Sequence, residues 1–209
     1  MSAPFRVLLV DDHPAVRTGL AALLACEPDL RPVGVAAGTR EALDLADELS
    51  PDVAIVDFQL GDRDGLTLCR QLRERRRPTR VVLYSAYADG PLAVAAVIAG
   101  ADGVVHKSAL ADELCGAVRS VARGERTIPA LSPTARATVA ARLEPDDLPI
   151  LAMLLDGTDP DEIAKVLGIT RGWLAARRWA MLERLRRMPT RRGASERRPA
   201  EAAGWLGRG

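Results

Sequence analysis

The stretch VLLVDDHP, from Val7 to Pro14, carries the clearest indication of the fold. Its four apolar residues, Val7 to Val10, are typical of a strand buried on both faces of a parallel sheet. They lead directly into two carboxylates, Asp11 and Asp12. Two adjacent negative charges repel each other and resist removal from water. A pair of acids at the edge of a core therefore indicates a site that holds a cation.

Residues 1–122 alternate short apolar runs with helical patterns. Strands that alternate with helices form a parallel sheet covered on both faces, so we expect an α/β fold with a five-stranded, doubly wound sheet. The predicted strands are Phe5–Val10, Pro32–Ala36, Val53–Val56, Val81–Tyr84 and Gly103–His106. The predicted helices are approximately Ala15–Ala25, Arg40–Glu48, Gly65–Arg75, Pro91–Ala99 and Asp112–Val121.

The remainder of the chain is predicted to form a small all-α domain. Residues 123–142 include the Pro-, Thr- and Ser-containing stretch RTIPALSPT and are interpreted as a linker. Residues 143–209 contain no strand-like run and end in a basic tail. The helical patterns in this part are Leu148–Leu155, Asp161–Leu167, Thr170–Arg187 and a possible short helix at Pro199–Leu206.

A net charge of +1 conceals an uneven distribution of charged residues. Residues 1–122 hold 13 basic and 17 acidic residues, whereas the chain from Ile163 onward holds 12 and 3. The segment Glu144–Glu162 carries seven acids and no base. A basic end favours a polyanionic partner such as nucleic acid, although a solvated arginine-rich tail has the same composition.

The composition also excludes several classes of protein. No apolar run approaches the length of about 18 residues that a membrane helix needs, so we expect no membrane partner. The first residues reach acids too soon to form a signal peptide. Three cysteines far apart in the sequence suggest neither a metal site nor a disulfide framework. We therefore expect a cytoplasmic protein.

Polar residues follow the other predicted strands in the same way. Asp57 follows the third strand, Ser85 the fourth and Lys107 the fifth. Because the carboxyl ends of parallel strands meet at one edge of a sheet, these residues should join Asp11 and Asp12 there. Two or three carboxylates suit Mg²⁺, which often bridges to a phosphate. A phosphoryl group on Asp57 could interact with the metal, the Ser85 hydroxyl and the Lys107 ammonium group at the same time.

Lys107 is informative because lysine is rare in this chain. Of 29 basic residues only Lys107 and Lys165 are lysine, and Lys107 stands at a predicted strand end. A compact ammonium on a flexible stem has a chemistry that the planar arginine fork does not offer. Purely structural roles are also open to these residues: a surface charge for Lys107, a helix cap for Asp57 and a turn for Ser85.

The set Asp11-Asp12, Asp57, Ser85 and Lys107 resembles the receiver domain of two-component response regulators. The stretches SAYADG and AGADGVVHKS add to the resemblance, which covers about the first 122 residues. It implies that a histidine kinase transfers phosphate to Asp57 and that Lys107 and Ser85 hold the phosphoryl oxygens.

The resemblance also implies a set of Mg²⁺ ligands. These are Asp12, Asp57 and the backbone carbonyl of Gln59, with Asp11 in support. Two positions depart from the family pattern. Val104 stands where many receivers have an aromatic switch residue, and Ser108 stands where many have proline.

The segment from Asp159 to Thr170 has the pattern of a helix, a turn and a second helix. Asp159 and Pro160 suit the start of a helix, Gly168 suits its end, and Thr170 caps the next. DEIAKVLGIT, preceded by LEPDDLPILAMLLDG, resembles the LuxR-type helix-turn-helix of NarL/FixJ-type regulators. The resemblance implies that the second helix binds double-stranded DNA. The candidate DNA-binding residues are Arg171, Arg177, Arg178 and Arg184.

The second helix departs from that family at several positions. Trp173-Leu174-Ala175 and Arg177 replace the usual Thr-Val-Lys and His, Arg178 replaces an apolar residue and Trp179 a polar one. We expect the two tryptophans to lie in a core or an interface. We also expect the acidic segment Glu144–Glu162 to face away from DNA, because it would repel phosphate.

These observations favour a response regulator in which phosphorylation of Asp57 controls homodimerisation and DNA binding. One alternative is a phosphorylation-independent dimeric regulator, or a protein-binding module with a degenerate output domain. Another is a Mg²⁺-dependent phosphatase on a similar sheet. Gln59 lies two residues after Asp57, where the familiar phosphatase arrangement has an acid, so we do not expect an enzyme.

Overall fold

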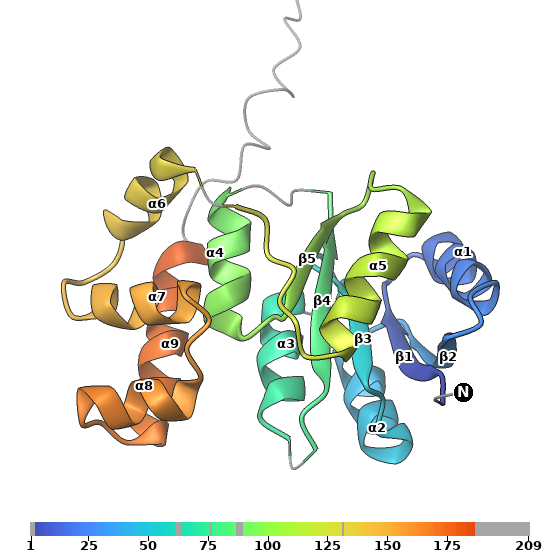
Figure 1. Ribbon diagram of the computed structural model, residues 1–209, viewed down its shortest axis with the longest axis horizontal. Coiled ribbons are helices and arrows are strands. Elements are labelled where there is room, and N and C mark those ends of the chain that lie inside the picture. The colour runs from blue at the N-terminus through green and yellow to red at the C-terminus, as the bar shows by residue number, and fades with distance from the viewer. Residues whose placement is uncertain (1–2, 62–63, 76, 87–89, 131, 187–209) are drawn as a thin grey trace, which may run out of the picture.

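The computed structural model describes residues 3–61, 64–75, 77–86, 90–130 and 132–186. Five parallel strands form one sheet in the order β2-β1-β3-β4-β5 (Figure 1). The expected α/β class is confirmed, and each strand lies within two residues of its predicted bounds. The strands are β1 (Phe5–Val10), β2 (Leu30–Ala36), β3 (Val53–Asp57), β4 (Arg80–Ser85) and β5 (Gly103–His106).

Helices cover both faces of the sheet, which places an apolar core on each side. The helices of this part are α1 (Pro14–Ala25), α2 (Thr39–Leu49), α3 (Gly65–Arg73), α4 (Gly90–Ala99) and α5 (Ala111–Ala122). Leu24 of α1 and Val118 of α5 pack on one side, whereas Leu72 of α3 and Ile98 of α4 pack on the other. Every residue of β3 is buried, which explains its uninterrupted apolar sequence.

Helix α4 differs from the other helices of the sheet because it is apolar all round. Its sequence is GPLAVAAVIA, and every residue from Leu92 to Ala99 is buried. A helix without a polar face must be covered on all sides. The sheet covers one side of α4, and the helices α6, α7 and α9 cover the other (Figure 1).

The second domain consists of the helices α6 (Pro133–Ala140), α7 (Asp147–Leu155), α8 (Pro160–Leu167) and α9 (Arg171–Arg186). Helix α6 lies inside the segment that we interpreted as a linker. Ser132 accepts a hydrogen bond from the backbone N–H of Ala135 at 3.1 Å, and Pro133 opens the first turn. The stretch SPT, from Ser132 to Thr134, therefore starts a helix.

The predicted turn between α8 and α9 is confirmed. The side chain of Asp159 accepts from the backbone N–H of Asp161 at 2.8 Å, and Gly168 ends α8 with a φ of 65°. Ile163, Leu174 and Met181 form the buried centre of this domain. The basic tail and the possible helix Pro199–Leu206 lie outside the described residues. In the described parts of the chain, no helix has the length and apolarity to cross a membrane.

Candidate functional site

The carboxyl edge of the sheet brings three predicted site residues into direct contact. Asp11 follows β1, Asp57 ends β3 and Lys107 follows β5. The Nζ atom of Lys107 lies 2.9 Å from Oδ2 of Asp11 and 2.8 Å from Oδ2 of Asp57. Both aspartates are almost completely buried, at 1% and 3% exposure. One ammonium group thus bridges two carboxylates that the sequence separates by 46 residues.

Asp12 and His13 complete a cluster of possible metal ligands. One ligand atom from each of Asp11, Asp12, His13 and Asp57 lies within 4.8 Å of all the others. Oδ1 of Asp12 is buried and has no hydrogen bond to any residue that the structure describes, although Nδ1 of His13 lies 2.6 Å from it. Carboxylate oxygens close together, one of them without a hydrogen bond, match the oxygen preference of Mg²⁺. His13 was not among the predicted site residues, and its only signal in the sequence is its place beside the acid pair.

The environment perturbs the protonation of Asp57 and Lys107. Burial raises the pKa of the Asp57 carboxyl, against the opposing effect of its hydrogen bond with Lys107. Burial alone would lower the pKa of Lys107, but its hydrogen bonds to Asp11 and Asp57 outweigh that effect, and the pKa is raised. The ammonium group is therefore held in its charged form between two acids.

The loop after β3 approaches Asp57 closely. The backbone N–H of Gln59 donates to Oδ1 of Asp57 at 3.2 Å, and the N–H of Gly65 donates to the carbonyl of Phe58 at 2.8 Å. A Cβ atom on Gly65 would lie only 2.2 Å from the carbonyl oxygen of Asp57. Glycine is therefore required at position 65 for this loop to close, a role that the sequence pattern did not reveal.

Ser85 and Tyr84 end the fourth strand beside this cluster. Ser85 is 1% exposed and pairs in register with His106 of β5. The hydroxyl of Tyr84 donates to the backbone carbonyl of Lys107 at 3.2 Å, which fixes the main chain from which the lysine extends. Val104 is buried in β5, so the position of the usual aromatic switch is filled by a small core residue.

The arginines predicted to bind DNA do not lie free on the surface of α9. Arg177 donates to the carboxylates of Asp147 and Glu144, and Arg184 binds the same two acids. These two acids belong to the segment Glu144–Glu162, which we expect to face away from DNA, and they contact two of the arginines predicted to bind it. Arg171 pairs with Asp161.

Arg178 points into the boundary between the two domains. Its Nε atom donates to the carbonyl of Ile98 in α4 at 2.8 Å. The guanidinium carbon Cζ of Arg70 in α3 lies 4.8 Å from the centroid of the Trp179 ring. Trp179 therefore lies at an interface, as expected. Trp173, by contrast, is 46% exposed. In this arrangement one side of α9 is occupied by the first domain.

A five-stranded parallel sheet with an acidic cluster and a lysine at its carboxyl edge, followed by a helix-turn-helix, defines a receiver joined to an output domain. The family of response regulator receiver domains matches residues 7–119. The chain therefore belongs to the response regulators.

Two relatives are similar to this chain over most of its length. The nitrate/nitrite response regulator protein NarL of Escherichia coli is 30% identical over an alignment of 194 residues, and the alignment covers 88% of this chain and 90% of NarL. The transcriptional regulatory protein LiaR of Bacillus subtilis is 32% identical over 79% of this chain and 83% of its own length.

Solved structures show the same fold. A LuxR-family response regulator from Aurantimonas superposes with a TM-score of 0.58 at 32% identity, covering 66% of this chain and 97% of that one. The response regulator RcsB in a DNA complex gives a TM-score of 0.59 at 21% identity, over 87% of this chain and 92% of that one. At that identity the second likeness concerns the fold alone.

Proposed function

We propose that this response regulator accepts a phosphoryl group on Asp57 from a histidine kinase, and that phosphorylation controls its homodimerisation and its binding to double-stranded DNA. The observation that carries the proposal is the bridge from Lys107 to both Asp11 and Asp57 at 2.9 and 2.8 Å. A cation already seated against the acceptor carboxylate is placed to stabilise the oxygens of an incoming phosphoryl group.

In this proposal the residues at the sheet edge have separate roles. Asp11, Asp12, Asp57 and the backbone carbonyl of Gln59 would hold Mg²⁺, which supplies positive charge against the phosphoryl oxygens. A carboxylate oxygen of Asp57 forms the new bond to phosphorus as the bond from phosphorus to the kinase histidine breaks. Lys107 and the Ser85 hydroxyl then hold the transferred oxygens.

The output domain must change its contacts before it can hold DNA. Arg178 and Trp179 bind the first domain, and Arg177 and Arg184 bind Asp147 at the start of α7 and Glu144 just before it. We propose that phosphorylation shifts a pre-existing equilibrium toward a form in which α9 leaves α4. The freed arginines would then contact phosphates and guanine edges in the major groove.

The first experiment tests the acceptor. The full chain is incubated with Mg²⁺ and acetyl phosphate, and its intact mass is measured beside that of Asp57→Asn. We expect a single phosphate adduct on the unmodified chain and none on the variant. An equal adduct on both proteins, or none on either, would remove Asp57 from its role.

The second experiment tests the output. The full chain, with and without acetyl phosphate, is titrated against labelled duplexes at several salt concentrations. Phosphorylation should strengthen binding, and the affinity should fall steeply with salt because phosphate contacts release counterions. Binding that is absent at low salt would favour the alternative of a protein-binding output domain.

One observation favours that alternative specifically. The exposed residues Trp173, Ala175 and Ala176 give α9 an uncharged strip, while Arg171, Arg177 and Arg184 are all paired with acids. Hydrolysis of many phosphate ester molecules per protein chain would instead indicate an enzyme. Neither the regulator nor the protein-binding module predicts such multiple turnover.

A further inference from the structure

A cleft of about 720 Å³ lies between the two domains. It is at the amino-terminal edge of the strands, opposite to the edge that holds Asp57. Arg80 begins β4 at this edge, whereas Ser85 ends β4 at the edge that holds the carboxylates. The volume is within the range of small-molecule sites, roughly 300–1,000 Å³. Arginines dominate the charged lining of the cleft. They are Arg70, Arg73, Arg80, Arg126, Arg171 and Arg178.

The acids in the cleft are already engaged. Glu74 pairs with Arg70 at 2.7 Å, Asp161 pairs with Arg171, and Asp102 lies 3.6 Å from Arg73. Asp102 also accepts from the backbone N–H of Val81 at 2.9 Å. The fourth acid, Asp159, accepts from the backbone N–H of Asp161 at 2.8 Å and so caps α8.

Three arginines of the cleft form no ion pair with any residue that the structure describes. Each donates one hydrogen bond to a carbonyl near the carboxyl end of a helix. The contacts are Arg178 Nε to Ile98 at 2.8 Å, Arg126 Nη1 to Leu154 at 2.8 Å and Arg80 Nη1 to Ala122 at 3.2 Å. A guanidinium carries five N–H donors, so most donors remain for a ligand.

The like charges lie close enough to affect one another. Burial lowers the pKa of both Arg126 and Arg178, and the neighbouring charge of Arg73 lowers each pKa further. Arg178 and Arg73 flank Gly100, where a Cβ atom would lie 3.1 Å from Nη2 of Arg178 and 3.6 Å from Cγ of Arg73. Positive charges gathered in a partly buried place favour an anion.

We propose that this interdomain cleft binds a small phosphorylated anion, with at least two negative charges, that bridges Arg126 and Arg178. Guanidinium forks match the spacing of phosphate oxygens and bind them in pairs. Because Arg126 follows α5 and Arg178 belongs to α9, one ligand would contact both domains. The ligand would therefore hold α9 against α4 and oppose DNA binding.

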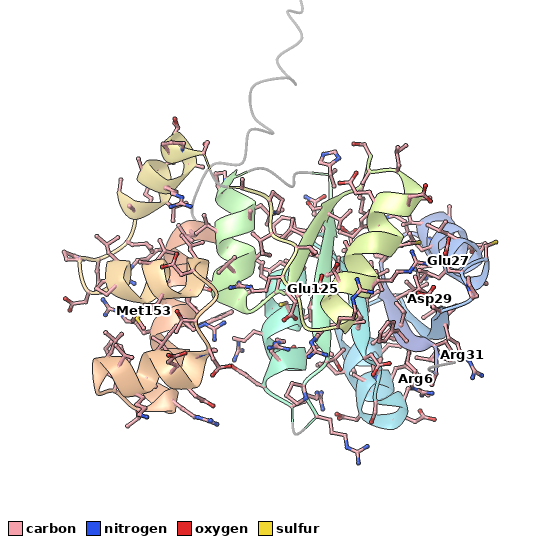
Figure 2. All side chains as sticks on the ribbon, in the orientation of Figure 1. Arg6, Glu27, Asp29, Arg31, Glu125 and Met153 are labelled. Atoms are coloured by element: carbon pink, nitrogen blue, oxygen red, sulfur yellow. The ribbon has the colours of Figure 1, made fainter. Side chains whose placement is uncertain are left out.

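Calorimetric titration of the full chain with inorganic diphosphate tests the proposal, without Mg²⁺ and at constant ionic strength. We expect binding that weakens at least about tenfold in Arg126→Gln and in Arg178→Gln, since each loses charge-assisted hydrogen bonds. Arg31→Gln is the matched control, because Arg31 is exposed on β2, far from the cleft (Figure 2). Lys107→Gln should bind like the unmodified chain, since its site lies at the other edge of the sheet.

Two further measurements separate a lost ligand contact from a lost fold. Arg178→Lys keeps the charge and should keep part of the affinity, while circular dichroism melting checks that each variant is folded. Diphosphate should also weaken DNA binding by the unmodified chain and not by Arg126→Gln. The proposal fails if diphosphate gives no heat at millimolar concentration, if Arg31→Gln weakens binding equally, or if Lys107→Gln abolishes it.

Discussion

The carboxyl edge of the sheet and the face of α9 differ in how far their charged side chains are paired with opposite charges. At the sheet edge, Lys107 binds Asp11 and Asp57, and Asp12 lies beside His13, so among the described residues three carboxylates meet one lysine and negative charge is in excess. On α9, Arg177 and Arg184 are matched by Asp147, which begins α7, and by Glu144, which precedes that helix. A site with unmatched charge can take up an ion without rearrangement. A surface whose charges are already paired must first lose those pairs before it can hold a polyanion.

The strongest test of this contrast is Asp147→Ala. Asp147 is fully buried, binds both arginines, and accepts from the backbone N–H of Glu144 at 2.9 Å. Removing it leaves two partly buried charges with less compensation, so the free energy of unfolding should fall by about 3 kcal/mol. Urea unfolding measures the change, with the exposed neighbour Asp146→Ala as control. Equal effects of the two substitutions would contradict the contrast.

Lys107→Arg tests the other side of the comparison. The charge is kept, but a planar fork cannot place one compact ammonium between Asp11 and Asp57. We expect phosphorylation-dependent dimerisation, followed by light scattering, to weaken at least about tenfold, or about 1.4 kcal/mol. Lys165→Arg is the matched control, because Lys165 is exposed on α8. Unchanged dimerisation of Lys107→Arg would show that only the positive charge at position 107 matters, and not the shape of the ammonium group.

Glu144→Gln should leave part of the positive charge of α9 unpaired, just as part of the negative charge at the sheet edge is unpaired. Glu144 is about half exposed and binds Arg177 and Arg184, so its loss frees donors at little cost in stability. DNA affinity at low salt should rise about threefold, in line with the small energies of exposed ion pairs. Glu162→Gln removes an equal charge from the same domain and measures the long-range contribution. An increase no larger than in this control would show that the pairs do not compete with DNA.

The smallest effect is expected for a compensated charge at the surface of the receiver. Arg119 on α5 binds Glu27 and Asp29, which lie together in the connection between α1 and β2 (Figure 2). The hydrogen bond from Arg119 lowers the pKa of Asp29, so its contribution to stability is present above the unfolded value of 3.8 and is lost at more acidic pH. Arg119→Gln should cost up to about 1 kcal/mol at neutral pH.

Unfolding of Arg119→Gln at a series of pH values, beside Arg31→Gln, measures this contribution. The difference between Arg119→Gln and the unmodified chain should shrink as the pH falls through the pKa of Asp29. A difference that stays constant down to pH 3 would mean that the guanidinium stabilises the fold by packing alone.

The sheet and its acidic cluster could be predicted because their signals are local. Each strand is a short apolar run, and parallel topology alone brings the strand ends to one edge. Asp11, Asp57 and Lys107 therefore met as expected. The place of His13 and the close approach of Gly65 depend on loop geometry, which no residue pattern specifies.

The output domain was harder to predict because its contacts join distant parts of the chain. Arg177 lies 30 residues from Asp147, and Arg178 lies 80 residues from Ile98. Helix α6 was missed because it buries little apolar surface, mainly Ala135 and Val139. Its capping signals, Ser132 and Pro133, are also common in linkers.

The apolar sequence of α4 links the opening of this protein to its self-association. If α9 leaves α4, buried side chains from Leu92 to Ala99 lose part of their cover, and large exposed apolar patches are rare on stable monomers. A second copy that covers the same surface would remove that cost. Opening and dimerisation then become one linked equilibrium, so the open fraction should rise with the concentration of the protein itself.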